Sequence, residues 1–453
     1  MRWSNMIILH LAAHATATAC LPSSECINRR PPLLERAFTS EAVNAAIEEL
    51  SARMSNDTQL ACLFRNTLPN TLDTTITPGA ANVLARGADG DSYTFVITGD
   101  IKAMWLRDST NQVLPYLRWA KTDAALARML LGVVRQQTEQ VNADPWANAH
   151  YLVESGMTTG NGGDDTSSPS KLCVASNGAC SYAGQRSAGM LPGIYERKYE
   201  LDSLMAFLKL SRTLHSALDG AEGGRADAVF GASWLAAVAR VLDVLEAEQT
   251  SSAEDAAKPC GPAYTFSRSN IAGQGPLDTL LHGVGRPAAR TGMIRSAFRP
   301  SDDACTYLFL IPANAMAVVE LRHTATLLRS IGRSGPTRDP TRDPTRDGAA
   351  TLARRCDAFA AEIDAAIQEH GVVHRADAGG SVYAYEVDGF GNAHLMDDAN
   401  VPSLLSLPWL GYVSPTDPTY LRTRACECDR LYATECPPAC LPRRRCQAPS
   451  RMR

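Results

Sequence analysis

Four short segments hold acidic, aromatic and amide side chains at a density that folding alone does not require. They span residues 98–109, 196–203, 296–304 and 383–392, and a further acidic run follows the last of them at 396–402. Carboxylates and arginine can hold pairs of sugar hydroxyls, while Trp and Tyr can stack on the apolar face of a pyranose ring. Their composition therefore indicates carbohydrate-binding loops that each lead into a helix.

A purely structural interpretation also fits part of this set. Asp302 and Asp303 precede a predicted helix, and Asp397 and Asp398 precede Val401. Acids at such positions can cap a helix and favour its macrodipole. The occurrence of four such segments in one mostly helical chain nevertheless favours a shared cleft.

Glycoside hydrolysis is a reaction that such a cleft could carry out, because it needs two carboxyl groups. One must be protonated near the leaving oxygen, and the other must be ionised. In an inverting enzyme the second carboxylate activates water on the opposite face of the sugar, with about 6.5–9.5 Å between the two groups. Residues far apart in the sequence suit this arrangement, since opposite walls of a cleft come from different loops.

The elements that would position these loops are mostly helical. Pro115 predicts a kink in one helix, and alternation typical of strands is confined to residues 93–98 and 382–387. Apolar residues recur at the helical period in stretches that predict helices at residues 42–54, 105–119, 122–141, 201–218, 227–247, 306–331 and 349–368. The sequence therefore predicts a predominantly α fold with long loops between the helices.

Two of the long loops point to different roles. Residues 158–193 are rich in Gly, Ser, Asn and Asp and too long for a mere connector, so they are either functional or disordered. Residues 336–347 consist of three tandem Pro-Thr-Arg-Asp units without an apolar side chain. This composition predicts a solvated extension with no catalytic role. No change in composition before Tyr420 indicates a second domain.

Five separated motifs, in the same order, closely resemble those of the metal-independent exo-α-1,6-mannosidases, glycoside hydrolase family 125. The resemblance covers residues 38–420 and implies an all-α catalytic domain, an (α/α)₆ barrel with long inter-helix loops and the site at its mouth. The predicted helices and long loops agree with that fold. The motifs are Thr98-Gly99-Asp100-Ile101 with Met104-Trp105-Leu106-Arg107-Asp108-Ser109, Lys198-Tyr199-Glu200 with Asp202-Ser203-Leu204, Phe298-Arg299-Pro300-Ser301-Asp302-Asp303, Tyr385-Glu386-Val387-Asp388-Gly389-Phe390-Gly391, and Met396-Asp397-Asp398-Ala399-Asn400-Val401-Pro402-Ser403-Leu404-Leu405.

The resemblance also implies an activity, the exo-acting hydrolysis of terminal, non-reducing α-1,6-linked mannose with inversion and without a metal. It makes Asp202 the general acid and Glu386 the general base. An acid needs a pKa raised by burial or by a nearby carboxylate, and Glu200 is a candidate neighbour. Glu200 is also a rival, because on a helix the two acids would point to different faces and only one would line the cleft. Asp388 rivals Glu386, since both would share a face of an extended segment.

The remaining motif residues are expected to bind the terminal mannose from different walls of the cleft. His282 lies outside the motifs, and a lone histidine is often a packed or surface residue. The motifs lack a His/carboxylate cluster at helical spacing, so we expect no metal site and no other cofactor. The expected substrate-binding residues are Asp100, Trp105, Arg107, Asp108, Lys198, Glu200, His282, Arg299, Asp302, Asp303, Asp388, Asp397 and Asp398.

Charge and composition limit the class of partner. The formal net charge is −4 and the isoelectric point is near 6.2, so there is no basic field to attract nucleic acid. The family resemblance implies a mannose-containing oligosaccharide or N-glycan as the partner, and we expect the chain to be a monomer.

Several features indicate the secretory pathway. Residues 1–20 combine one positive charge, a short apolar stretch and small residues, which predicts a cleaved signal, and no other stretch is apolar for the roughly 20 residues of a membrane span. Asn56-Asp57-Thr58 is a glycosylation acceptor pattern. Among 13 cysteines, Cys173 and Cys180 bracket a short loop, which predicts a local disulfide in an oxidising compartment. We therefore expect a secreted or luminal protein.

The C-terminal segment departs from the family pattern. Residues 424–453 hold five cysteines among Pro and Arg without an apolar period, which predicts a non-homologous tail without a stable fold. Because family members continue past the segment matching residues 417–420 with further helices, we expect a barrel that is incomplete at this end. The alternative to an active enzyme is then a truncated, non-catalytic member that at best binds mannosides. Another (α/α)₆ activity, such as a sugar epimerase, would be expected to use His, whereas these motifs supply carboxylates.

Overall fold

The computed structural model describes residues 26–78, 93–99, 101–151, 164–166, 191, 193–218, 229–259, 261–268, 278–334 and 344–435. Several sequence predictions lie outside these ranges. They concern the signal segment at 1–20, the proposed binding residue Asp100, the pair Cys173 and Cys180, and most of the two long loops.

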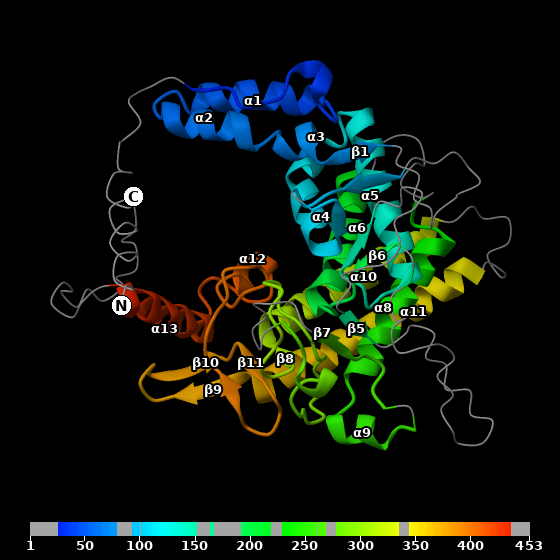
Figure 1. The fold of residues 1–453 in the computed structure, drawn as a ribbon, viewed down its shortest axis with the longest axis vertical. Coiled ribbons are helices and arrows are strands. Elements are labelled where there is room, and N and C mark those ends of the chain that lie inside the picture. The colour runs from blue at the N-terminus through cyan, green and yellow to red at the C-terminus, as the bar shows by residue number, and fades with distance from the viewer. Residues whose placement is uncertain are drawn as a thin grey trace, which may run out of the picture.

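Helices dominate the described chain (Figure 1). They are α1 (Glu41–Arg53), α2 (Thr58–Thr67), α3 (Asn70–Thr74), α4 (Leu106–Val113), α5 (Ala124–Ala143), α6 (Leu201–Leu218), α8 (Ala232–Glu248), α9 (Ser252–Ala257), α10 (Ile311–Ser334), α11 (Pro344–Ala366), α12 (Leu407–Leu410) and α13 (Pro418–Glu435). Shorter helical turns are η1 (Leu33–Glu35), η2 (Leu114–Trp119), η3 (Leu281–Gly283) and the π-helical η4 (Ile367–Gly371).

The strands are short and pair antiparallel in small sheets. They are β1 (Ile76–Pro78), β2 (Thr94–Val96), β3 (Ala103–Trp105), β4 (Ala149–Tyr151), β5 (Asp164–Thr166), β6 (Ile194–Glu196), β7 (Phe266–Arg268), β8 (Phe309–Leu310), β9 (Val372–Arg375), β10 (Gly380–Tyr383), β11 (Glu386–Val387) and β12 (Ala393–His394). Two three-stranded sheets, β3-β4-β6 and β12-β11-β8, carry residues of the sequence motifs.

Capping residues fix where several helices begin. Ser40 accepts a hydrogen bond from the third residue of α1, and Asp123 accepts two from the first turn of α5. Ser251 and Glu254 form a reciprocal capping box at the start of α9. These bonds satisfy amide groups that a helix leaves without an internal partner.

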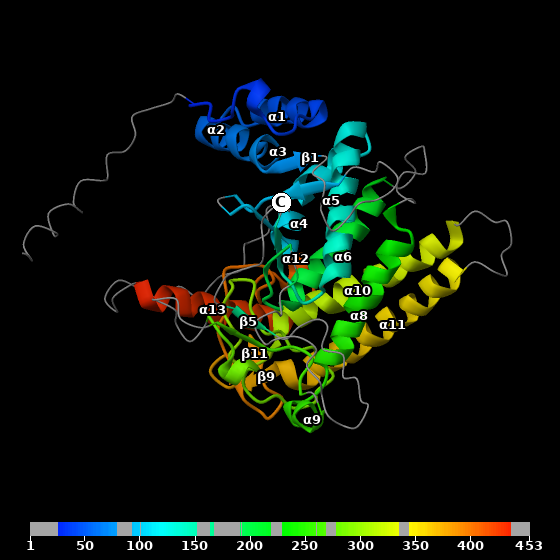
Figure 2. The same cartoon turned by 45° about the vertical axis from the view of Figure 1, so that its right-hand side comes forward.

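The long helices form a closed circuit of contacts around the core. Along this circuit α6 packs on α10, α10 on α11, α11 on α8, α8 on α5 and α5 on α6 (Figures 1 and 2). Phe207, Phe230 and Trp234 are fully buried within it. The indole N–H of Trp234 donates to Ser211 at 3.0 Å, so its one polar atom is satisfied.

The predicted helices at 42–54, 122–141, 201–218, 227–247 and 349–368 correspond to α1, α5, α6, α8 and α11. The helix predicted at 105–119 is shorter. Trp105 ends β3, and the segment around Pro115 continues as the 3₁₀ turn η2, because proline lacks an amide hydrogen for the α-helical pattern.

The helix predicted at 306–331 begins only at Ile311, because Phe309–Leu310 pairs with β11 as strand β8. The predicted strand at 93–98 contains β2, and the one at 382–387 is divided between β10 and β11. Helix α13 continues to Glu435 and α11 begins at Pro344, so residues 424–435 of the Cys/Arg segment and residues 344–347 of the repeat are helical.

Two contacts tie α13 to the preceding hairpin of β9 and β10. The hydroxyl of Thr423 accepts from the amide of Tyr383 at 2.9 Å, and Arg422 Nε donates to the carbonyl of Ser381 at 2.8 Å.

Within the described ranges, no helix combines the length and the apolar composition needed to cross a bilayer.

Candidate active site

Asp202 lies in the first turn of α6, and its side chain is fully buried. The chain that enters this helix is held by a neighbouring loop. Ser296 Oγ accepts from the amide of Leu201 at 3.0 Å, and the amide of Phe298 donates to the carbonyl of Tyr199 at 3.1 Å. These bonds fix a helix end that would otherwise fray, so the Asp202 carboxyl has a defined position.

One guanidinium nitrogen joins Asp202 to Glu200. Nη1 of Arg107, at the start of α4, lies 2.6 Å from Glu200 Oε2 and 3.0 Å from Asp202 Oδ2. Ser203 Oγ also donates to Glu200 Oε2, at 2.7 Å. The prediction that these two acids diverge on a helix is wrong, because α6 begins at Leu201 and Glu200 precedes it. Both carboxyl groups belong to one buried cluster.

This cluster has more acidic groups than its one arginine neutralises, since Asp108 also approaches Arg107 Nη2, at 3.6 Å. Burial raises the pKa of Glu200 well above its ordinary value and also raises the pKa of Asp202, against the pull of Arg107. Glu200 Oε1 and Asp202 Oδ1 are buried without a hydrogen-bond partner among the described residues. The cluster is therefore suited to keep a proton on a carboxyl group.

Glu386 has a different environment. It lies in β11, the middle strand of its sheet, and its side chain is fully buried. Oε1 accepts from Arg299 Nε at 2.6 Å, and Oε2 accepts from the amides of Thr306 and Tyr307 at 3.0 and 3.1 Å. Nδ1 of His394 lies 3.4 Å from Oε2. Both carboxylate oxygens are thus surrounded by groups that stabilise negative charge.

These contacts reverse the effect of burial on Glu386. Burial alone would raise its pKa, but the contacts with His394 and Arg299 outweigh it and hold the pKa below its ordinary value. Glu386 is therefore ionised under conditions in which the cluster around Arg107 retains a proton. One protonated and one ionised carboxyl group is the combination that glycoside hydrolysis requires.

A single loop connects the two environments. Residues 296–298 hold the start of α6, and residues 299–307 supply Arg299 and the two amides that hold Glu386. Asp302 turns this loop with a φ of 69°, and Lys198 Nζ donates to its carbonyl at 2.9 Å. The Asp302 carboxylate interacts electrostatically with Lys198 and Arg107. Predicted binding residues from three motifs thus meet at one place.

Aromatic side chains lie on the sheet β3-β4-β6. The ring of Trp105 packs edge-on against Tyr195, with centroids 5.2 Å apart, and Tyr195 packs in the same way on Tyr151 at 4.9 Å. The sheet also carries Glu196, whose Oε1 lies 3.8 Å from Lys198 Nζ. Because β3 leads directly into α4, these side chains adjoin the cluster around Arg107.

Comparison with known proteins decides the family. The family model described as "Metal-independent alpha-mannosidase (GH125)" matches residues 57–430. The chain belongs to this family. It is a glycoside hydrolase of GH125, as the motifs indicated.

Two relatives of this GH125 chain are informative. It is 41% identical over 400 residues to the meiotically up-regulated gene 157 protein of Schizosaccharomyces pombe. The matched region covers 87% of this chain and 69% of that relative. It also resembles a metal-independent alpha mannosidase of Streptococcus pneumoniae, whose structure contains alpha-1,6-mannobiose in a non-productive complex. The TM-score is 0.67 at 32% identity, over 86% of this chain and 77% of the other. This match confirms the (α/α)₆ barrel as the fold.

Asp388, the alternative candidate for the general base, lies in a tight turn. Its Oδ1 accepts from the amides of Phe390 and Asn392 at 2.8 and 3.1 Å. Gly389 in the same turn has a φ of +78°, and a Cβ there would lie 2.5 Å from Thr291 Cγ2. The Asp388 carboxylate thus shapes the hairpin that follows Glu386.

Asp397 and Asp398 also bind nearby backbone. Asp397 accepts from the amides of Leu404 and Leu405 at 2.7 and 2.9 Å, and burial raises its pKa to about 6. Asp398 accepts from the amide of Asn400 at 3.0 Å. The helix-capping interpretation of this motif is wrong, because no helix begins at Val401 and α12 starts only at Leu407. Asp398 also interacts with Ser301 and with Arg299 of the neighbouring motif.

Two other predicted binding residues have a looser relation to the site. Asp303 is half-buried, and its carbonyl accepts from the amide of Arg299 at 2.8 Å. His282 is exposed on η3, and in the described part of the chain we find no hydrogen bond or ion pair between it and the motif carboxylates. Among the described residues, no group of three or more His, Cys, Asp or Glu is arranged to hold a metal ion.

Sequence reasoning missed two residues near Glu386. His394 faces it across the pairing of β11 with β12. Cys305 is a buried thiol, and burial together with the charge of Glu386 raises its pKa well above its ordinary value. The Gly-containing turn after Glu386 was a signal for His394, because a hairpin there places the two residues on paired strands. Nothing local in the sequence marks Cys305.

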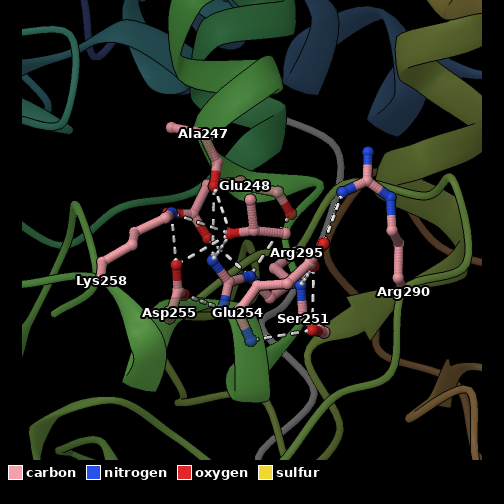
Figure 3. A network of polar contacts seen from close by, with 9 residues as sticks. Ala247, Glu248, Ser251, Glu254, Asp255, Lys258, Arg290 and Arg295 are labelled. Carbon is pink, nitrogen blue, oxygen red and sulfur yellow. Dashed lines mark hydrogen bonds and ion pairs between the residues drawn. The ribbon is translucent and has the colours of Figure 1, made fainter.

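A second ion cluster lies beside the loop of residues 296–307 (Figure 3). Arg295 Nε is 3.0 Å from Glu248 Oε2, and its Nη1 is 2.7 Å from Asp255 Oδ2. Lys258 Nζ is 2.6 Å from Asp255 Oδ1. Burial raises the pKa of Glu248 to about 7, against the pull of Arg295. Because Arg295 directly precedes Ser296, this cluster anchors the end of the loop that holds α6.

Proposed function

We propose that this chain hydrolyses terminal, non-reducing α-1,6-linked mannose with inversion, using Asp202 as the general acid and Glu386 as the general base. The observation that carries the proposal is a difference in contacts between two buried carboxyl groups. Asp202 shares one arginine nitrogen with Glu200, whereas Glu386 accepts from an arginine of its own and from two backbone amides. Burial raises the pKa of Asp202, whereas the contacts around Glu386 lower its pKa despite burial. A proton donor and an ionised base are then present together at the same pH.

In the proposed reaction Asp202 donates its proton to the glycosidic oxygen as the bond between that oxygen and C1 breaks. A water molecule attacks C1 from the opposite face, and Glu386 takes a proton from this water. The products are mannose with the β configuration and the alcohol of the remaining glycan. Asp202 ends ionised and Glu386 ends protonated, so each must exchange a proton with solvent before the next turnover.

The substrate class rests on the family and on the Streptococcus pneumoniae relative, whose complex contains alpha-1,6-mannobiose. The loop residues Arg299 and Asp302, together with Arg107, would hold the hydroxyls of the terminal mannose, and Trp105 would pack against the ring. We propose that the natural partner is a mannose-containing oligosaccharide or N-glycan. All of these side chains come from one chain, so a monomer is sufficient.

The direct test follows hydrolysis of α-1,6-mannobiose by NMR, with the anomeric signal of the first product recorded before mutarotation. We expect β-mannose from the wild type, unchanged turnover after treatment with a chelator, and a loss of about 10²–10⁴-fold in kcat for Asp202→Asn and for Glu386→Gln. Release of α-mannose, or a protein that melts cooperatively and shows no turnover, would contradict the proposal. The second result would indicate a mannoside-binding protein instead.

A change of leaving group separates the acid from the base. With an activated aryl α-mannoside, departure of the leaving group needs little protonation, so Asp202→Asn should recover most of its activity while Glu386→Gln should not. Glu200→Gln and Asp388→Asn are the matched controls for the rival assignments. The assignment fails if Glu200→Gln, rather than Asp202→Asn, is the variant that is selectively rescued.

We also propose that the protein resides in the secretory pathway or outside the cell. Cys26 and Cys62 form a disulfide that ties the segment before α1 to α2, and such bonds persist in oxidising compartments. Asn56 is exposed in the turn between α1 and α2. Expression in a secretory host should give a product whose mass falls on enzymatic deglycosylation, and Asn56→Gln should abolish that fall. A reduced, unglycosylated and cytosolic native protein would overturn this proposal.

A further inference from the structure

Glu386 needs a way to lose the proton that it takes from water. Its side chain is 0% exposed, so the carboxyl group cannot hand a proton directly to bulk solvent. A buried base that stays protonated is inactive in the next turnover. The groups in contact with Glu386 must therefore include one that accepts a proton and also reaches solvent.

Most of the groups around Glu386 cannot do this. The guanidinium of Arg299 does not give up its proton in proteins, and its pKa is raised further by Glu386 despite burial. The amides of Thr306 and Tyr307 donate hydrogen bonds but do not titrate. The thiol of Cys305 is buried, and its raised pKa keeps it protonated.

Unlike these groups, His394 carries an imidazole ring and is partly exposed to solvent. Imidazole accepts and releases protons near neutral pH. The side chain of His394 is 39% exposed, whereas Nδ1 lies 3.4 Å from Glu386 Oε2. Its place is set by the backbone, since β12 pairs with β11 in a register that puts His394 opposite Glu386. The contact is longer than the 2.6–3.1 Å of the other three donors to Glu386, as expected of a contact that closes during turnover.

We propose that His394 is the proton exit of the base, passing the proton of Glu386 to solvent after each hydrolysis. This rests on the proposed role of Glu386. While Glu386 is ionised, Nδ1–H of His394 donates to its carboxylate. Once Glu386 has taken a proton, the half-exposed ring turns outward, releases its Nδ1 proton to one water molecule, gains a proton on Nε2 from another, and returns with the Nδ1 lone pair facing the carboxyl O–H of Glu386. That proton passes to Nδ1 and restores the carboxylate, and the imidazolium releases its Nε2 proton to solvent. No oxidant or further reactant is needed.

The test compares His394→Asn, His394→Ala and wild type at saturating α-1,6-mannobiose, with and without added imidazole. Asn retains an N–H near the position of Nδ1 but cannot carry a proton. We expect both variants to lose tenfold or more in kcat with KM changed less than twofold. Imidazole should restore kcat of His394→Ala in proportion to its free-base concentration. Wild-type kcat for His394→Asn would mean that His394 only donates a hydrogen bond, and would overturn the proposal.

Controls separate this inference from misfolding and from failure of the proposed function. His374→Gln, at the exposed position of strand β9, is the matched histidine control and should leave kcat unchanged. Equal melting temperatures for the His394 variants and wild type exclude a folding defect. If Glu386→Gln remains active, the base assignment fails. If Glu386→Gln is inactive but imidazole does not rescue His394→Ala, only the proton-exit proposal fails.

Discussion

Nη1 of Arg107 lies 3.0 Å from Oδ2 of Asp202, in a cluster where the same nitrogen also binds Glu200 at 2.6 Å. One guanidinium therefore serves two buried acids, and it is not enough to ionise both. Glu386 presents the reverse case, a single buried acid with an arginine of its own and two backbone amides. This difference in the number of donors per carboxyl group is the physical basis for proposing Asp202 as the acid and Glu386 as the base.

The dependence of activity on pH should follow from these two environments. The general acid must be protonated, so kcat should fall as the pH rises through the raised pKa of Asp202. The general base must be ionised, so kcat should fall as the pH drops through the lowered pKa of Glu386. The pH profile of kcat on α-1,6-mannobiose checks both limbs. Glu200→Gln should move the alkaline limb to lower pH, because it removes a carboxylate from the neighbourhood of Asp202. An unmoved alkaline limb would argue against this coupling.

Loss of Arg107 should affect stability as well as activity. Arg107→Met leaves the carboxyl groups of Glu200 and Asp202 buried without their cation, which we expect to cost about 3–5 kcal/mol of unfolding free energy at neutral pH. The cost should be smaller at pH 5, where both acids can be neutralised by protonation. Denaturant unfolding at the two pH values measures the difference, and an equal loss at both would contradict the charge argument.

Replacing Arg299 should change the base selectively. Arg299→Gln removes the cation 2.6 Å from Glu386 Oε1, so the pKa of Glu386 should rise and the acidic limb of the kcat profile should move to higher pH. Arg290→Gln is the matched control, because Arg290 pairs with Glu254 at an exposed position. The alkaline limb should stay in place in both variants. A shift of both limbs would mean that Arg299 acts on the whole site.

Glu248 should make folding stability depend on pH. Its pKa in the folded protein is about 7, above the value of about 4.3 expected for an unfolded glutamate. The folded state thus binds the proton more tightly, and this contribution is fully present below about pH 4 and is lost as the pH rises to about 7. A tenfold change in proton affinity corresponds to about 1.4 kcal/mol, so the contribution is on the order of 3 kcal/mol. Glu248→Gln should flatten the pH dependence of the melting temperature between pH 5 and 7.5, and an unchanged slope would exclude this role.

The Cys26–Cys62 disulfide should stabilise the N-terminal helices without taking part in catalysis. Its sequence separation is 36 residues, for which loop-closure entropy predicts about 3–4 kcal/mol at most. None of the described residues of α2 is fully buried, so this helix depends on α1 and on the disulfide for its place. Cys26→Ser with Cys62→Ser should lower the melting temperature and leave kcat within twofold. A large fall in kcat with an unchanged melting temperature would show a different role.

The sequence by itself determined the family and most of the helices. Apolar residues at the helical period report directly on the buried face of a helix, which is why the predicted span 201–218 and the observed α6 coincide. It also singled out the carboxyl groups of Asp202 and Glu386, because both lie in motifs that occur in the same order as in the family. It could not show that Glu200 and Asp202 bind the same arginine, since that depends on the packing of Arg107 against the start of α6.

Only the tertiary structure decided what surrounds each carboxyl group. Arg107 is more than 90 positions from Glu200 and Asp202 in the sequence, and Arg299 is 87 from Glu386. No local pattern contains such pairs, because the fold brings them together from different helices and loops. Ionisation depends on burial and on neighbours within a few ångströms. The sequence therefore named the two carboxyl groups, and only the packing around them gives each the surroundings on which its proposed role as acid or base rests.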